Sequence, residues 1–162
     1  MNFIDILKET VAGEMLITFV LSMVPVMELR GAIPIGVGMG LSPLTAMMVS
    51  VVGNMIPVPF IILFIRRIFA WLRRNFPRVD GFITKLETKA HLKGETVKKY
   101  KYLGLCIFVA IPLPGTGAWT GALIATVLDM SLRRALPSIL LGVIIAGCVI
   151  TGLTYGFTSL LF

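Results

Sequence analysis

The chain has 162 residues, of which 57% are hydrophobic, and its mean hydropathy is +0.94. A soluble domain of this size does not need so much apolar surface, so the composition excludes an ordinary soluble protein and predicts a polytopic membrane protein. The formal net charge is +7, and most of the positive charge falls in one internal segment. We therefore expect a single membrane domain, residues 1–162, with only a few full crossings.

The first residues predict a helix at a membrane interface. Within residues 2–14, apolar side chains fall on one helical face and charged side chains fall on the other. The apolar face comprises Phe3, Ile4, Leu7 and Val11, and the polar face comprises Asp5, Lys8 and Glu9. This arrangement is typical of a helix that lies in the plane of the membrane surface.

A half-length apolar segment then leads to a charged break. Met15–Val24 has only about half of the ~20 residues that a spanning helix needs. Glu28 and Arg30 follow it, between Pro25 and Pro34. An ionisable group at membrane depth is costly unless it is paired or hydrated, and broken backbone there is tolerated only inside protein or beside a watery cavity. The segment predicts the centre of a translocation site, and the alternative is a short extramembrane loop between two ordinary spans.

The chain continues with a predicted short return and a predicted full crossing. Ile35–Gly40 is short and rich in glycine, and Leu41–Pro43 has the composition of a turn. Leu44–Ile65 is long enough to span a bilayer, and we expect it to bend near Pro57 and Pro59.

Residues 66–101 form a basic segment between the hydrophobic regions. Its cations are Arg66, Arg67, Arg73, Arg74, Arg78, Lys85, Lys89, Lys93, Lys98, Lys99 and Lys101, and its acids are Asp80, Glu87 and Glu95. The positive-inside rule places this segment in the cytoplasm. Its apolar residues recur at helical spacing, at Phe82, Ile83, Leu86, Ala90, Val97 and Tyr100. The pattern suits either an amphipathic helix on the anionic inner leaflet or a solvated connector, in which His91 would also be solvated.

The second half of the chain repeats the order of the first half. Tyr102–Ile111 is a half-length apolar segment, Pro112–Gly117 is a proline- and glycine-rich break, and Ala118–Leu128 is a short return. Asp129–Ser131 has the composition of a turn, and Ala135–Phe162 is long enough to span. We also expect Asp129 and Arg133 to form an interfacial ion pair near this turn.

The order predicts an all-α integral membrane protein built as an inverted repeat of two units. Each unit is a re-entrant helical hairpin followed by a full transmembrane helix, and a cytoplasmic amphipathic connector joins them. The repeats cover residues 13–65 and 102–162, and the connector covers residues 66–101. A re-entrant hairpin returns to its own side, so each unit crosses the membrane once and both termini lie outside. Inverted repeats of this kind are the architecture of many secondary transporters.

In this architecture we expect the tips of the two hairpins to meet near the membrane midplane. The candidate residues for binding a substrate or a proton are Glu28, Arg30, Gly31, Pro34, Pro112, Pro114, Gly115, Thr116 and Gly117. The planar fork of Arg30 matches a phosphate or a carboxylate, and a half-helix that begins at a glycine-rich break directs N–H groups at an anion. Glu28 is the one carboxyl group expected at this depth, and it could exchange protons during a cycle. Trp119 could line the cavity or anchor packing.

The remaining side chains do not indicate enzymatic chemistry. Cys106 and Cys148 are isolated in apolar segments, and we interpret them as small packing residues. The sequence contains no visible nucleophile–base pair, metal cluster or nucleotide motif. We therefore expect no cofactor, no metal and no catalytic activity.

Residues 28–34 (ELRGAIP) and 112–121 (PLPGTGAWTG) resemble the two signatures of the small multidrug export protein family. The resemblance spans about Met15–Phe157. That family is similar to the DedA/VTT membrane protein superfamily, whose members carry paired re-entrant hairpins and include polyprenyl-phosphate and phospholipid translocases. The resemblance implies the prokaryotic inner membrane as the location and Glu28 as the acidic residue of the first hairpin. The second tip departs from the superfamily, which places an essential arginine in the second half.

Three functions fit these observations. The first is a small transporter or flippase, proton-coupled through Glu28, for an amphipathic substrate with an anionic head such as a lipid-linked phosphate. The second is export of lipophilic cationic drugs, with Glu28 as the counter-charge. The third is a non-transporting membrane scaffold or assembly protein. The expected partners are anionic membrane lipids and a second copy of the chain, most simply in a dimer, because two full spans are few to enclose a pathway, and we expect no nucleic acid.

Overall fold

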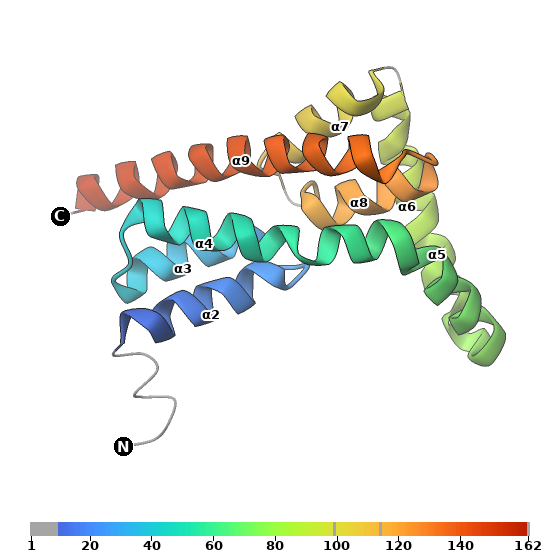
Figure 1. Cartoon of the computed structure of the whole chain (residues 1–162), viewed down its shortest axis with the longest axis horizontal. Coiled ribbons are helices and arrows are strands. Elements are labelled where there is room, and N and C mark those ends of the chain that lie inside the picture. Colours follow the sequence, from blue (N-terminus) through green and yellow to red (C-terminus); the bar gives the residue numbers. More distant parts are fainter. Residues whose placement is uncertain (1–9, 99, 114, 162) are drawn as a thin grey trace. The chain divides into compact units, whose positions relative to one another are not determined.

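The structure is a computed structural model that describes residues 10–98, 100–113 and 115–161, and this part of the chain is all-α (Figure 1). The elements are α2 (Val11–Met23), α3 (Glu28–Met39), α4 (Pro43–Met55), α5 (Pro57–Asn75), the short 3-10 helix η1 (Pro77–Val79), α6 (Asp80–Lys98), α7 (Lys101–Ala110), α8 (Ala118–Val127) and α9 (Leu132–Leu161). Two segments, Pro43–Asn75 and Leu132–Gly156, are long and apolar enough to cross a membrane. Both expected full spans therefore have helical counterparts of sufficient length.

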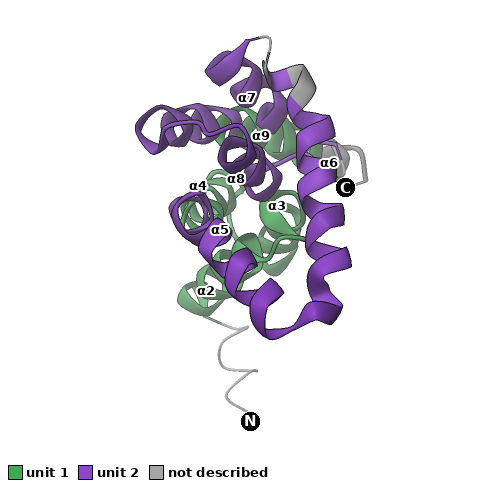
Figure 2. Ribbon diagram, turned by 90° about the vertical axis from the view of Figure 1, so that its right-hand side faces the viewer, with its two compact units in different colours: residues 1–56, 143–162 green, residues 57–142 purple. Residues whose placement is uncertain are grey.

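The chain packs into two compact units (Figure 2). Unit 1 comprises residues 1–56 and 143–162, and unit 2 comprises residues 57–142. Unit 1 contains α2, α3, α4 and the C-terminal part of α9, and unit 2 contains α5, η1, α6, α7, α8 and the first residues of α9. The inverted repeat and its boundaries stay a prediction.

In unit 1, α2, α3 and α4 lie side by side, and each packs against the other two (Figure 1). The turn between α3 and α4 has the expected chemistry. Gly40 has φ +120°, which a side chain would strain, and the Ser42 hydroxyl accepts a hydrogen bond from the backbone N–H of Thr45 at 3.2 Å. Pro43 occupies the first helical position, where its missing N–H costs nothing. The predicted turn is therefore confirmed.

Small residues let the helices of unit 1 approach closely. A Cβ atom at Gly36 of α3 would lie 2.7 Å from Thr18 Oγ1, and one at Gly53 of α4 would lie 2.0 Å from Ser22 Oγ. Both contacts are made with α2, and at Gly147 of α9 a Cβ atom would lie 3.2 Å from Met47 of α4. Close helix packing through glycine is typical of proteins in a bilayer, where apolar side chains alone give little association.

In unit 2, α8 is the central helix and packs against α5, α6 and α7. Most of its residues are buried, and Gly121 allows contact with α7, since a Cβ atom there would lie 2.6 Å from Val109 Cγ2. The basic segment contains the expected helix, α6, whose Ile83, Ala90 and Val97 are buried. Much of the apolar face of α6 thus packs within unit 2 rather than facing outward, whereas Phe82 is 65% exposed.

The first break is shorter than the sequence predicts. Only Val24–Met27 separates α2 from α3, so Glu28 and Arg30 lie on a helix and not on broken backbone. Pro34 lies inside α3, where it removes one backbone hydrogen bond without ending the helix. Packing of α3 against α2 and α4 keeps this segment helical.

Two smaller differences concern helix boundaries. In the predicted interfacial helix 2–14, residues 2–9 lie outside the described residues, and residues 11–14 form the first turn of α2 instead. The expected bend near Pro57 and Pro59 is present as an interruption at Ile56, between α4 and α5.

Candidate functional site

The first turn of α3 carries the acid–base pair in a strained and buried setting. Glu28 has φ +47° and is 6% exposed, although this backbone region is unfavourable for residues with a side chain. Such strain costs about 1–3 kcal/mol and is most often found at functional sites. Arg30 is half-buried and lies within electrostatic reach of Glu28. The positive end of the α3 dipole therefore coincides with a guanidinium and a buried carboxyl group.

Four more polar side chains are buried among the described residues of unit 1. Thr18 and Ser22 on α2 donate hydrogen bonds to the backbone oxygens of Glu14 and Phe19, each at 2.7 Å. Ser50 and Asn54 on α4 differ from them. Both are 0% exposed, and Ser50 Oγ, Asn54 Nδ2 and Asn54 Oδ1 have no hydrogen-bond partner among the described residues.

The helix register brings Asn54 level with Glu28. The turn at residues 40–42 makes α3 and α4 antiparallel, and a Cβ atom at Gly36 would lie 3.2 Å from Ala46 Cβ (Figure 1). Glu28 lies eight residues before Gly36, and Asn54 lies eight residues after Ala46. Glu28 and Asn54 are therefore each about 12 Å from the Gly36–Ala46 contact along the helix axes, in the same direction. We call Ser22, Glu28, Arg30, Ser50 and Asn54 the unit 1 polar site.

The two members on α4 were missed by the sequence analysis. The available signal was the spacing of four residues between Ser50 and Asn54, which places two polar groups on one face of an otherwise apolar span. Polar groups inside a spanning segment are costly and most often functional.

Two predicted site residues lie on α3. Gly31 shares the first turn of α3 with the acid–base pair, and Pro34 lies further along the helix.

The second tip, residues 111–117, is held by hydrogen bonds of its own. The Thr116 hydroxyl lies 2.6 Å from the backbone oxygen of Ile111 and 2.8 Å from that of Leu113, and it accepts from the Leu113 N–H at 3.2 Å. Gly115 and Gly117 have φ +78° and +150°, which favour glycine. The Thr116 side chain thus shapes the turn, and Pro114 lies outside the described residues.

A lysine from the basic segment contacts this tip. The Lys93 ammonium group on α6 donates a hydrogen bond to the backbone oxygen of Gly115 and lies 6.0 Å from the centre of the Phe108 ring. The sequence pattern identifies Lys93 only as one of the charges of the connector. The structure therefore provides a cation at the second tip. Trp119 is half-buried in the first turn of α8, and the predicted meeting of the two tips stays a prediction.

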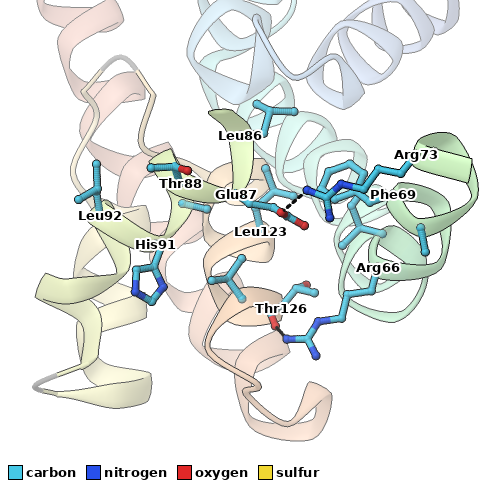
Figure 3. Close-up of a pocket in the computed structure, with 14 residues that line it drawn as sticks. Arg66, Phe69, Arg73, Leu86, Glu87, Thr88, His91, Leu92, Leu123 and Thr126 are labelled. Carbon is cyan, nitrogen blue, oxygen red and sulfur yellow. Dashed lines mark hydrogen bonds and ion pairs between the residues drawn. The ribbon is translucent and has the colours of Figure 1, made fainter. Parts of the chain in front are cut away.

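Unit 2 contains a separate cavity of about 530 Å³ between α5, α6 and α8 (Figure 3). Its apolar walls include Ile65, Phe69, Leu86, Leu123 and Val127, and its polar lining residues are Arg66, Arg73, Glu87, Thr88, His91 and Thr126.

The predicted pairing of Asp129 was wrong, because its carboxylate lies 2.7 Å from Arg66 of α5. The Arg66 guanidinium also donates to the backbone oxygen of Thr126.

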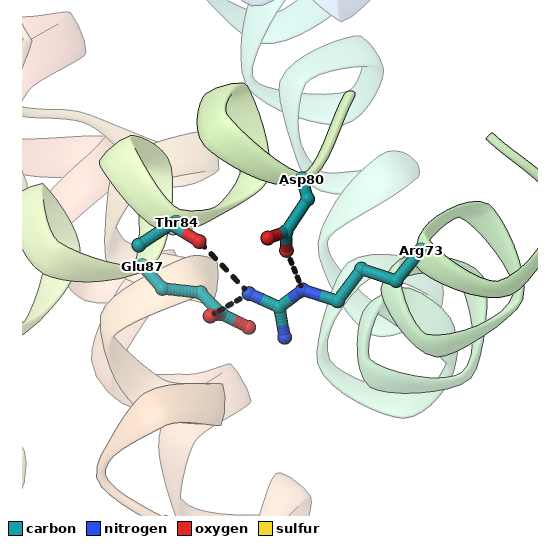
Figure 4. Close-up of polar contacts among 4 residues, drawn as sticks. All are labelled: Arg73, Asp80, Thr84 and Glu87. Atoms are coloured by element: carbon teal, nitrogen blue, oxygen red, sulfur yellow. Dashed lines mark hydrogen bonds and ion pairs between the residues drawn. The ribbon is translucent and has the colours of Figure 1, made fainter. Parts of the chain in front are cut away.

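Arg73 connects the end of α5 to the start of α6 (Figure 4). Its Nε donates to Asp80 at 2.8 Å, and one Nη donates to Glu87 at 2.7 Å and to the Thr84 hydroxyl at 3.4 Å. Two carboxylates and a hydroxyl thus engage one guanidinium, so Arg73 has a structural role in this wall of the cavity.

Comparison with known families gives one match. Residues 28–149 match the model of a family described as "Putative small multi-drug export protein". This match begins at Glu28. It includes the second tip, the cavity of unit 2 and every residue of the unit 1 polar site except Ser22. No curated protein and no solved structure matches the chain.

Proposed function

The chain belongs to this small multidrug export family, and from this we propose that it is a membrane transporter that binds an amphipathic, anionic substrate at the unit 1 polar site. The two candidate spans support a location in the membrane. The substrate class goes beyond the family description and rests on the chemistry of the first turn of α3.

One observation carries the proposal most directly, namely the buried amide of Asn54. Leaving a buried polar group without a partner costs about 1–3 kcal/mol, so a chain that keeps an asparagine there gains something other than stability. The position of Asn54 at the same height along the helices as Glu28 suggests that the gain is ligand binding. The amide can donate through Nδ2 and accept through Oδ1, which suits a head group that carries both an anion and a hydroxyl.

Two further features favour an anion. The N-terminus of α3 favours negative charge, and Arg30 adds a permanent charge whose planar fork fits a phosphate or carboxylate. Glu28 is the proton-exchanging group in this proposal, because its burial makes its charged form sensitive to what occupies the site. The substrate and a proton would then compete for the same turn of α3.

Export of a lipophilic cation is the second candidate, and the burial of Glu28 is the observation that favours it. A buried carboxylate is the counter-charge that such a drug requires. Arg30, within electrostatic reach on the same turn, opposes a second cation, so we place this function behind the first.

The re-entrant inverted repeat and a homodimer belong to the same proposal. Cysteines at positions 27 and 113 would test whether the two tips meet, and the cross-linked fraction would be read on a gel. Efficient cross-linking supports the paired hairpins, and labelling of the two cysteines from opposite membrane surfaces contradicts them.

The deciding experiment is transport in proteoliposomes with and without a pH gradient. A fluorescent lipid with an anionic phosphate head and a lipophilic cationic dye would be compared, with empty liposomes as the blank. Movement of the anionic probe that depends on Glu28 and Asn54 supports the proposal. Movement of the dye alone supports the second candidate, and movement of neither, in liposomes that contain folded protein, supports the non-transporting scaffold.

A further inference from the structure

The cavity of unit 2 is large enough for a ligand and shares no residue with the unit 1 polar site. Its volume of about 530 Å³ lies within the range of about 300–1,000 Å³ that is usual for small-molecule sites. Most of its lining is apolar, and the charged groups come from α5 and α6 (Figure 3). Such a cavity suits an amphipathic molecule with an apolar chain and a charged head.

The flanking residues indicate that this molecule is a lipid. Trp71 and Phe76 lie at the end of α5 with their rings 6.0 Å apart, and both are exposed, as is Phe82 at the start of α6. Exposed aromatic residues beside arginines are typical of the boundary between membrane and water. Residues 66–101 also carry a large excess of positive charge, which attracts anionic lipids of the cytoplasmic leaflet.

The two arginines of the cavity differ in how firmly they are held. Arg73 contacts two carboxylates, whereas in the described part of the chain Arg66 pairs with one carboxylate, that of Asp129. The side chains of Arg66 and Asp129 are 55% and 79% exposed. An ion pair this exposed contributes little to stability, so an anion can replace Asp129 at Arg66 at small cost. Arg66 is therefore the cation that is available to a head group.

We infer that the cavity between α5, α6 and α8 binds one acidic phospholipid, with an acyl chain against Phe69 and Leu123 and the phosphate at Arg66. The site is independent of transport at the unit 1 polar site. Its lipid is held as a bound component of the protein, in contrast to lipids that only surround the helices.

Native mass spectrometry of the purified full-length chain tests this inference. Phosphatidylglycerol and phosphatidylcholine with identical acyl chains would be offered separately at equal concentration. We expect one tightly retained lipid and a preference for phosphatidylglycerol of about fivefold, the contribution of one arginine near an anionic lipid. Equal retention of the two lipids would overturn the assignment of an acidic head group.

Matched variants locate the lipid. Ala70→Trp and Thr88→Trp enlarge exposed residues that line the cavity, and Ala12→Trp enlarges an exposed alanine of α2 in unit 1. We expect loss of the retained lipid in whichever cavity variants fold, and no loss in Ala12→Trp. Retention in a folded cavity variant at the level of Ala12→Trp would show that the lipid binds elsewhere.

Charge variants locate the head group. Arg66→Gln should remove the preference for phosphatidylglycerol, whereas Arg78→Gln removes the same charge from an exposed arginine that does not line the cavity. An equal loss in both variants would mean that only the general positive charge matters, and it would overturn the role of Arg66. Asn54→Leu should retain the lipid normally, which separates this site from the proposed transport site.

Discussion

Replacing Asn54 with leucine should stabilise the protein and abolish transport. Asn54 is 0% exposed, and neither atom of its amide has a hydrogen-bond partner among the described residues. Removing an unpartnered buried polar group should recover about 1–3 kcal/mol, and leucine has the same number of side-chain heavy atoms in the same branching. Since about 1 kcal/mol shifts the midpoint by about 2–4 °C in a chain of this length, the melting temperature should rise by about 2–12 °C.

The assay is a thermal melt in detergent, followed by transport of the anionic probe in proteoliposomes. Asn75→Leu is the matched control, because Asn75 is exposed and its amide donates to the backbone oxygen of Trp71 at 3.0 Å. The control should not be more stable and should transport normally. A lower melting temperature for Asn54→Leu would show that the protein itself satisfies the amide, and normal transport would place Asn54 outside the substrate path.

Other predictions test the remaining parts of the argument. Glu28→Gln should remove the pH dependence of transport while the protein stays folded. Arg30→Lys should reduce transport although it keeps the charge, because an ammonium cannot reproduce the planar fork. Normal transport in both would show that the pair only stabilises the hairpin. Gly53→Ala should lower the unfolding free energy by about 1–3 kcal/mol, since its Cβ would meet Ser22 Oγ at 2.0 Å and Phe19 O at 2.6 Å. The control Gly38→Ala should not lower it, because a Cβ atom there would have open space around it. Equal melting temperatures of the two variants would contradict the close packing of α2 and α4. Cysteines at positions 2 and 162 should react with an impermeant reagent in intact cells, and one at the exposed position 85 should react only after lysis; the reverse pattern would reject the predicted topology.

Helix content and helix order could be predicted because they depend on local chemistry. The turn at residues 40–42 and the break before α8 follow from the composition of those segments, and both are present. The extent of the first break could not be predicted. Pro34 usually ends a helix, but contacts of α3 with α2 and α4 outweigh the single hydrogen bond that it removes.

The sequence by itself determined the membrane class, the two long apolar helices, the basic segment and the position of Glu28 and Arg30 as charges in an apolar stretch. These properties are sums over neighbouring residues, so a linear chain displays them. Only the tertiary structure decided that Asn54 lies level with Glu28, that Asp129 pairs with Arg66, and that Lys93 contacts the second tip. The physical reason is that these partners lie far apart in the chain, 63 positions for Arg66 and Asp129, and are brought together by the packing of helices. Hydropathy and local spacing contain no information about which distant groups this packing brings together.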